Sequence, residues 1–158
     1  MNIKNIITIY GSYYPKNEAK RLKILRDCLR EKEIENIEIT REYPVSYFPF
    51  NLPSDQNLKN LERSRYCLRT SELNILIFTF EGEKSGVGHE LEISLHKNIE
   101  FLLLVEVKEQ RGRKIVAGSS LLQGRLKETS NSFIEFPEGD DVYLCDVVYS
   151  RIIDYFNY

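Results

Sequence analysis

The segment SGVGHE, residues 85–90, combines residue types that could bind an anion and attack an electrophilic carbon. Gly86 and Gly88 permit a tight turn and a close approach of the backbone to a ligand. Free N–H groups at the start of a helix favour an anion, and Lys84 and Ser85 would add a positive charge and a hydroxyl donor. The segment is therefore a candidate phosphate site.

Glu90 is the candidate nucleophile of this segment. We expect it in the first turn of a helix, where the helix dipole keeps its carboxylate ionised. An ionised carboxylate beside the anomeric carbon of a sugar can attack that carbon or stabilise an oxocarbenium ion. A glutamate at a helix start is also common for capping alone, and a single Gly-x-Gly loop is weak support for a phosphate site. From these residues alone, both interpretations stay open.

Alternating strands and helices must position this segment. Apolar and β-branched runs predict five strands, over residues 6–10, 34–40, 73–80, 99–107 and 132–136. Helical spacing predicts helices over residues 17–32, 58–70 and 87–97, a short helical turn within 115–126, and a closing helix within 137–156 that begins near Asp140 or Asp141. This order predicts an α/β, single-domain, flavodoxin/Rossmann-like fold with a mainly parallel five-stranded sheet and helices on both faces.

Ligands of such sheets bind beyond the carboxyl ends of the strands. The loops expected at that edge are residues 11–17, 81–90 and 108–120. The segment 43–57 is rich in proline and aromatic residues and cannot form a regular helix or a central strand. It is either a lid that stacks on a base, which we favour, or a buried Ω-loop.

The string SGVGHELEISLHKNIEFLLL resembles the signature of the nucleoside 2-deoxyribosyltransferase superfamily. It is most similar to the branch of 2′-deoxynucleoside 5′-monophosphate N-glycosidases, in which Gly-x-Gly-aromatic-Glu-Leu opens a helix before a strand. IYGSYY, LERSRYCLRTSELNILIF and GSSLLQG are similar to further family segments and occur in the same order. The resemblance covers most of residues 1–158 and implies cleavage of the N-glycosidic bond of a (deoxy)nucleoside or its 5′-monophosphate.

The resemblance also implies residue roles. Glu90 would form a covalent glycosyl-enzyme intermediate, which water or an acceptor base then resolves. Either Lys84 or Ser85 would contact the phosphate, and Ser119 would reach it from a neighbouring subunit of a homodimer or higher homo-oligomer. The residues implied in substrate binding are Tyr10, Gly11, Ser12, Glu42, Lys84, Ser85, Gly86, Gly88 and Ser119. Purely structural roles are the alternatives, since Tyr10 could be an aromatic residue of the core and Ser119 could cap a turn.

Ser64 departs from the family pattern, because it stands where the family has an Asp that assists protonation of the leaving base. A serine cannot act as that acid. Either Glu62 or Glu42 substitutes from another direction, or the activity is weak or altered. Two alternative functions therefore remain: a catalytically impaired nucleotide-binding or sensor module of the same fold, and a TIR-like NAD glycohydrolase.

Composition excludes other classes of function. The chain has 158 residues, 42% of them hydrophobic, and a formal charge of -2 without a long basic block, which argues against nucleic-acid binding. No apolar run approaches the ~20 residues of a membrane span. The three cysteines, Cys28, Cys67 and Cys145, are expected to be reduced, as in a cytoplasmic protein. His89 and His96 do not form a metal-binding pattern, so neither a metal nor a cofactor is expected.

Overall fold

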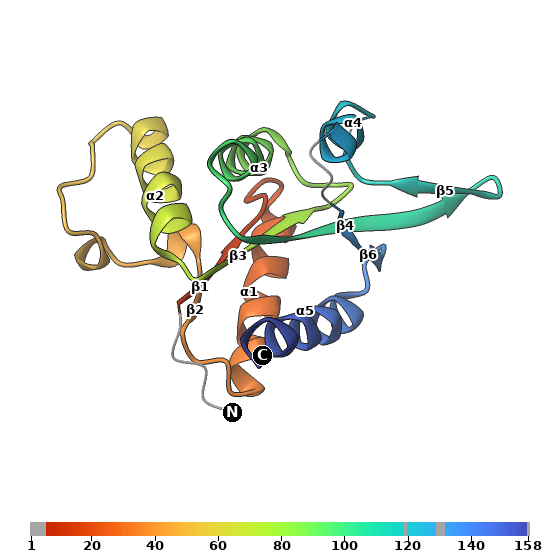
Figure 1. Cartoon of the computed structure of the whole chain (residues 1–158), viewed down its shortest axis with the longest axis horizontal. Coiled ribbons are helices and arrows are strands. Elements are labelled where there is room, and N and C mark those ends of the chain that lie inside the picture. Colours follow the sequence, from red (N-terminus) through yellow and green to blue (C-terminus); the bar gives the residue numbers. More distant parts are fainter. Residues whose placement is uncertain (1–5, 119, 129–131, 158) are drawn as a thin grey trace.

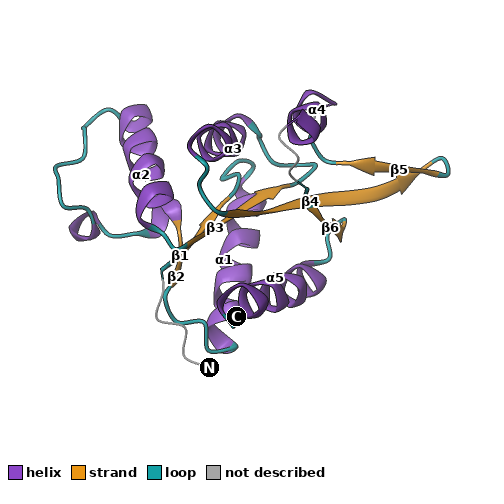
Figure 2. Ribbon diagram, viewed as in Figure 1, coloured by secondary structure: helices purple, strands orange, loops and turns teal. Residues whose placement is uncertain are grey.

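The computed structural model describes residues 6–118, 120–128 and 132–157. They form one mixed sheet with helices on both faces (Figures 1 and 2). The strands are β1 (Ile7–Tyr10), β2 (Ile37–Ile39), β3 (Leu73–Phe78), β4 (Phe101–Gln110), β5 (Arg113–Val116) and β6 (Ile134–Pro137). The helices are α1 (Lys16–Glu31), α2 (Gln56–Thr70), α3 (Ser85–Lys97), α4 (Ser120–Glu128) and α5 (Asp141–Phe156), with short 3-10 helices η1 (Thr40–Glu42) and η2 (Val45–Tyr47).

The five strands that the sequence predicts are all present and all parallel. β2, β1, β3 and β4 follow one another across the sheet, and β6 pairs with β4. The chain leaves β1 toward β2 on one side and later returns to β3 on the other side. The strand order therefore reverses at β1, and the carboxyl ends of β1 and β3 are the place where a ligand site is expected.

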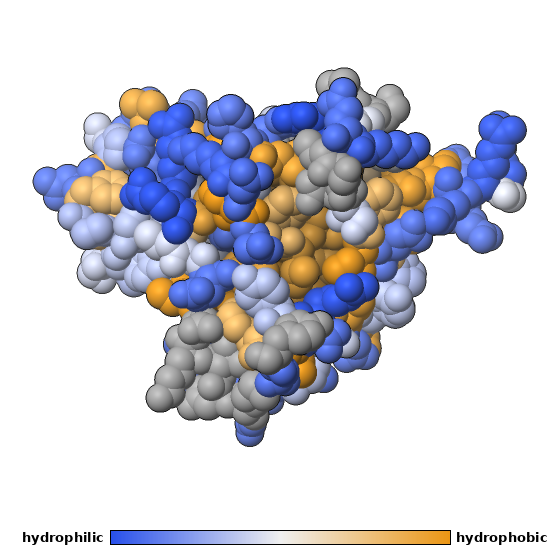
Figure 3. Space-filling view, viewed as in Figure 1, coloured by the Kyte–Doolittle hydropathy of each residue, from blue (hydrophilic) through white to orange (hydrophobic). Residues whose placement is uncertain are grey.

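β5 is a strand that the sequence analysis missed. Residues 108–120 were expected as a loop, but β5 pairs antiparallel with the end of β4, from Val107↔Val116 to Gln110↔Arg113. Arg111 and Gly112 form the turn with positive φ angles of 53° and 74°, as in tight hairpin turns. The hairpin projects from the body and is hydrophilic toward its tip (Figures 1 and 3). The residues next to the turn are exposed and polar, so that part of the hairpin shows no apolar alternation, and the sequence did not reveal β5.

Backbone hydrogen bonds place β5 relative to the rest of the sheet. Ala117 N donates to Glu106 O, whereas Glu138 N donates to the next carbonyl, that of Val107. Successive carbonyls of a strand point to opposite sides. β5 and β6 therefore pair with opposite edges of β4. β5 lies on the same edge of β4 as β3, beyond the carboxyl end of β3.

Two apolar layers cover the sheet. One layer packs α1 and α5 on one face, through residues such as Leu25, Ile75 and Val148. The other packs α2 and α3 on the opposite face, through residues such as Leu68, Leu76 and Leu91. Strands buried on both faces explain the continuous apolar runs in the sequence. Among the described residues, no helix combines the length and apolar character needed to cross a membrane.

The segment rich in proline and aromatic residues packs on α2. Tyr43 stacks on Tyr47 with 4.2 Å between ring centroids, and Phe48 lies against Tyr66 at 5.4 Å. Arg63 Nη1 donates to Tyr43 O over 2.9 Å and ties the segment to α2. Tyr43 and Phe48 are buried. These contacts favour the buried Ω-loop over the lid.

Cys28 of α1 and Cys145 of α5 form a disulfide, so the expectation of three reduced cysteines is wrong. The two helices lie side by side on one face of the sheet, and their Cα atoms are 6.5 Å apart at a sequence separation of 117. Because the two cysteines are so far apart in the sequence, the sequence alone did not indicate their pairing. Cys67 is a free, buried thiol. The cysteine argument for a cytoplasmic location is thereby lost, and that location stays a prediction.

Thiol alkylation tests this pairing. In denaturant without reductant, iodoacetamide is expected to modify one cysteine, Cys67, because the other two are joined. After reduction all three should react, and intact-mass spectrometry counts the adducts. Three adducts without reductant would show that the disulfide does not form in the isolated protein.

Candidate functional site

Two loops meet at the carboxyl ends of β1 and β3. Glu83 N, after β3, donates to Tyr14 O, after β1, over 2.9 Å. A Cβ on Gly82 would lie 2.8 Å from Ser12 Cβ, so only glycine allows this approach. A Cβ on Gly11 would lie 2.6 Å from Leu22 Cδ2 of α1. The loops after β1 and β3 thus come together as predicted.

A cleft of about 90 Å³ opens between these loops and the end of β2. Its lining consists of Gly11, Ser12, Tyr13, Tyr14, Arg41, Glu83, Gly86 and Val87. Glu90 is not part of this lining. It lies one helical turn beyond Gly86 and Val87 on α3, so the cleft ends short of its carboxyl group in this structure.

Glu90 lies in the second turn of α3 and not in the first, because the helix already begins at Ser85. Its Oε1 accepts a hydrogen bond from Ser64 Oγ of α2 over 2.8 Å. Its Oε2 is buried and has no hydrogen-bond partner in the described part of the chain. The residue as a whole is partly exposed, but this oxygen is not. An orphaned buried carboxyl oxygen is costly and indicates a functional role.

Burial raises the pKa of Glu90 to about 7, although the Ser64 hydrogen bond and the positive charge of Arg41 act to lower it. The expectation that the helix dipole keeps this carboxylate fully ionised is therefore wrong. The dipole fades beyond the first turn, and desolvation favours the neutral form. A carboxyl group with a pKa near neutrality can act as a general acid or base at neutral pH, and its ionised form can act as a nucleophile.

Ser64 is buried on α2 and reaches Glu90 directly. The two proposed substitutes for an acid do not. Glu62 pairs with Arg65 at 3.5 Å, and Glu42 lies 3.7 Å from Lys23 Nζ. Within the described residues, neither carboxylate is hydrogen-bonded to Glu90. The structure thus joins Ser64 and Glu90 and leaves the other two apart.

Replacing Ser64 with alanine is expected to raise the pKa of Glu90 further, because the lost hydrogen bond favours the ionised form. A carboxyl-detected NMR titration of Glu90 measures the shift. Ser94→Ala is the matched control, since Ser94 Oγ donates to the backbone oxygen of Glu90. An unchanged midpoint in Ser64→Ala would show that the hydroxyl does not act on the carboxylate.

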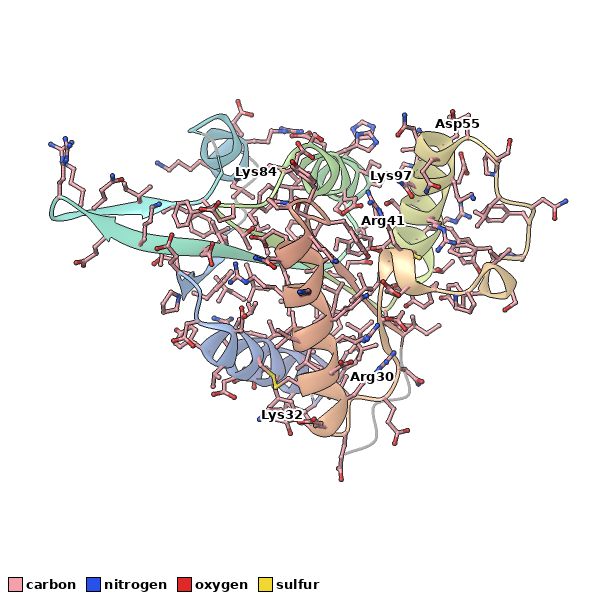
Figure 4. All side chains as sticks on the ribbon, turned by 180° about the vertical axis from the view of Figure 1, so that it is seen from behind. Arg30, Lys32, Arg41, Asp55, Lys84 and Lys97 are labelled. Atoms are coloured by element: carbon pink, nitrogen blue, oxygen red, sulfur yellow. A yellow bond between two sulfur atoms is a disulfide. The ribbon has the colours of Figure 1, made fainter. Side chains whose placement is uncertain are left out.

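The start of α3 already holds an anion, the carboxylate of Glu83. Its Oε1 accepts from Ser85 N over 2.8 Å and its Oε2 from Ser85 Oγ over 2.7 Å. The Ser85 hydroxyl and amide hold the pKa of this carboxyl below its usual range. Lys84 Nζ donates to Phe80 O and Gly82 O, at 3.0 and 2.9 Å, and so is tied to its own loop (Figure 4). The polar groups expected to hold a phosphate are thus engaged within the chain.

Gly86 and Gly88 lie in the first two turns of α3 without a neighbour that requires them. A Cβ at either position would meet nothing within 4 Å. Glycine in a helix costs about 1 kcal/mol relative to alanine. Packing within the described residues does not explain this cost, whereas close approach of a ligand would.

Tyr10 and Ser12 serve local structure. Tyr10 is buried, and its hydroxyl donates to Asn74 Oδ1 of β3 over 2.7 Å, as expected of a core aromatic. Ser12 Oγ donates to Tyr14 O over 2.6 Å and shapes the loop. Ser119 lies outside the described residues, so its predicted phosphate contact stays a prediction.

Arg41 and Tyr13 are site residues that the sequence analysis missed. The Arg41 guanidinium carbon lies 4.3 Å from the centroid of the Tyr13 ring, and Arg41 N donates to Tyr13 Oη over 3.1 Å. Arg41 belongs to η1, and Figure 4 shows it on the side of the sheet that carries α2 and α3. The pair unites the loop after β1 with the end of β2, so no local sequence signal could have revealed it.

A buried ionic network holds the loop after β3 in place. Glu106 is 1% exposed and accepts from Phe80 N and Gly139 N, both over 2.9 Å, and from Arg21 Nη2 over 2.8 Å. Burial acts to raise the pKa of Glu106, but these hydrogen bonds and the Arg21 charge outweigh it and lower that pKa.

The same network continues through Glu18, whose Oε2 accepts from Thr79 Oγ1 over 3.0 Å. Thr79 Oγ1 in turn accepts from Gly82 N over 3.1 Å. Arg21 Nε also donates to Asp141 Oδ1 over 2.9 Å. The base of the site is thus braced by α1 and α5. The described residues contain no group of three or more His, Cys, Asp and Glu side chains that could hold a metal ion.

Comparison with known proteins supports the α/β fold. No protein-family model matches the sequence, and no curated protein matches it. The solved structures of translation elongation factor SelB from Methanococcus maripaludis are similar, with the GTP analogue GppNHp at a TM-score of 0.56 and in the apo form at 0.54. Each is 17% identical, and the match covers 99% of this chain but only 35% and 34% of the SelB chains. At this identity the likeness concerns the fold alone.

Proposed function

We propose that the protein is an N-glycosidase or deoxyribosyltransferase of the nucleoside 2-deoxyribosyltransferase type, acting on a (deoxy)nucleoside or its 5′-monophosphate through Glu90. The observation that carries the proposal is the buried, partly unsatisfied Glu90 carboxyl group in the second turn of α3, the helix that follows β3. Gly86 and Gly88, four and two residues before it and otherwise unexplained, support a ligand that approaches α3 closely.

The proposed reaction has two steps. Glu90 Oε2 attacks the anomeric carbon, a C–O bond forms, and the electron pair of the broken C–N bond leaves with the base. Ser64 keeps Oε1 oriented throughout. Water or an acceptor base then attacks the same carbon and releases Glu90, which completes hydrolysis or transfer.

This site differs from the family pattern in how the leaving base is protonated. Within the described residues, no second carboxyl group is hydrogen-bonded to Glu90, and Ser64 cannot supply a proton as an acid would. With no acid in contact with Glu90, we propose that the leaving base takes its proton from water. We expect slow turnover of ordinary substrates and faster turnover of those with activated leaving groups.

GTP binding as in the SelB complex is not favoured for this chain. The sequence contains no G-x-x-x-x-G-K-[ST] segment, whose backbone N–H groups and lysine hold nucleotide phosphates in P-loop proteins. A second candidate function, a nucleotide-binding or sensor module, is favoured by one observation: Ser64, not an acid, contacts Glu90. Such a module would bind nucleotides without turnover.

A chromatographic screen for released base tests the proposal. The protein is incubated with nucleosides, their 5′-monophosphates and NAD. Base release from nucleosides or monophosphates, absent in Glu90→Ala, supports the proposal, and release of nicotinamide alone assigns the TIR-like activity. Binding without any release assigns the sensor module.

We also propose that the protein forms a homo-oligomer. A monomer measured by light scattering would contradict the role proposed for Ser119.

A further inference from the structure

We propose that Arg41 is the anion-binding residue of the cleft and that it selects a substrate carrying a 5′-phosphate. The inference rests on the proposed function for the identity of the ligand, and it moves the phosphate contact from the start of α3 to the opposite wall, at the end of β2.

The start of α3 already carries a negative charge, that of the Glu83 carboxylate. The Glu83 carboxylate already accepts the Ser85 amide and hydroxyl, and Lys84 Nζ is bound to two carbonyl oxygens of its own loop. A phosphate placed there would lie beside the negative charge of Glu83. The chain itself thus supplies an anion at the usual anion site of such a loop, which disfavours a second anion there.

Arg41 has the properties that the helix start lacks. It lines the same cleft, it is exposed, and its guanidinium carbon lies 4.3 Å from the centroid of the Tyr13 ring. None of the ion pairs in the described part of the chain involves Arg41. The contact with Tyr13 holds the guanidinium at the cleft, and its N–H groups are suited to donate to two phosphate oxygens.

The position of Arg41 relative to Glu90 fits this role. The Arg41 charge acts to lower the pKa of Glu90, and no ion pair joins the two residues in the described part of the chain. A substrate with its phosphate at Arg41 would lie against Gly86 and Val87, about one helical turn before Glu90 on α3. Attack on its anomeric carbon requires the Glu90 carboxyl group to turn toward the cleft.

Isothermal titration calorimetry on the Glu90→Gln variant tests the proposal. This variant should not turn the ligand over and carries no charge at position 90, so the measurement reports binding alone. The probes are the 5′-monophosphates of deoxyadenosine, deoxyguanosine, deoxycytidine and thymidine, each compared with its nucleoside. The best monophosphate is expected to bind about tenfold to a hundredfold more tightly than its nucleoside. Adding Arg41→Ala should remove this preference, and Arg41→Lys should restore part of it because the charge returns without the planar fork.

Arg69→Ala is the matched control, since Arg69 also lies over a tyrosine ring, that of Tyr66, at 5.8 Å, but outside the cleft. It should leave the preference unchanged. Equal affinities for monophosphate and nucleoside, a preference that survives Arg41→Ala, or no binding of any monophosphate overturns the Arg41 site. The proposed function fails separately, when the wild-type protein binds these ligands but releases no base.

Discussion

Glu90→Gln is expected to lower base release at least about a thousandfold, because an amide cannot replace a carboxylate as nucleophile. The same substitution should stabilise the fold above pH 7. Gln keeps the shape of the side chain and can still accept from Ser64, but it never carries the charge that burial disfavours. Loss of activity together with gain of stability is typical of functional residues.

The direction of this stability change follows from the linkage between folding and proton binding by Glu90. The pKa of Glu90 rises from an ordinary 4.5 to about 7 on folding, so the folded state binds the proton more tightly. The stabilisation from this proton is complete below pH 4.5 and is lost as the pH rises to about 7. At about 1.4 kcal/mol for each pKa unit, the full loss is on the order of 3 kcal/mol.

Urea unfolding at pH 5 and pH 8 measures this effect. The variant should gain up to about 3 kcal/mol relative to wild type at pH 8 and much less at pH 5. Glu92→Gln is the control, because Glu92 is an exposed glutamate on the same helix. The same Glu90→Gln difference at both pH values would show that Glu90 does not titrate near neutrality, and full activity would remove it from the mechanism.

Local patterns in the sequence were sufficient for the parallel part of the sheet. β1, β3 and β4 are buried on both faces and therefore appear as apolar runs, and Asp140 caps α5 through a hydrogen bond from Tyr143 N of 2.9 Å. The start of α3 was placed too late because two glycines argued against a helix at Ser85. That error put Glu90 in the first turn and led to the wrong ionisation state.

Contacts between distant segments were not predictable. Arg41 over Tyr13 and the disulfide between α1 and α5 join residues whose proximity only the folded chain creates. Ser64 illustrates the same limit: the sequence marked it as unusual, but its hydrogen bond to Glu90 depends on how α2 packs beside α3. The chemistry of a residue can be inferred from its type, and its partners require the fold.

Glu106→Ala is expected to destabilise the protein by about 3–5 kcal/mol, as when one partner of a buried ion pair is removed. It would leave Phe80 N and Gly139 N without their acceptor and remove one of the carboxylates that bind Arg21. Glu109→Ala, an exposed site on the same strand, should have little effect. Glu106→Gln keeps an acceptor oxygen and should lose less, which preserves a test if the alanine variant does not fold.

The pH dependence of Glu106 should oppose that of Glu90. Its pKa is lowered on folding, so its contribution is present above the ordinary value of 4.5 and is lost as the pH falls through the lower folded value. Wild-type stability is therefore expected to fall on both sides of about pH 4.5 to 5, toward acid through Glu106 and toward neutrality through Glu90. Denaturant unfolding from pH 3 to 8 should show that Glu106→Ala weakens only the fall of the free energy of unfolding toward acid pH. If this variant also lost the fall in stability toward neutral pH, the network, and not the burial of Glu90, would set the ionisation of the site.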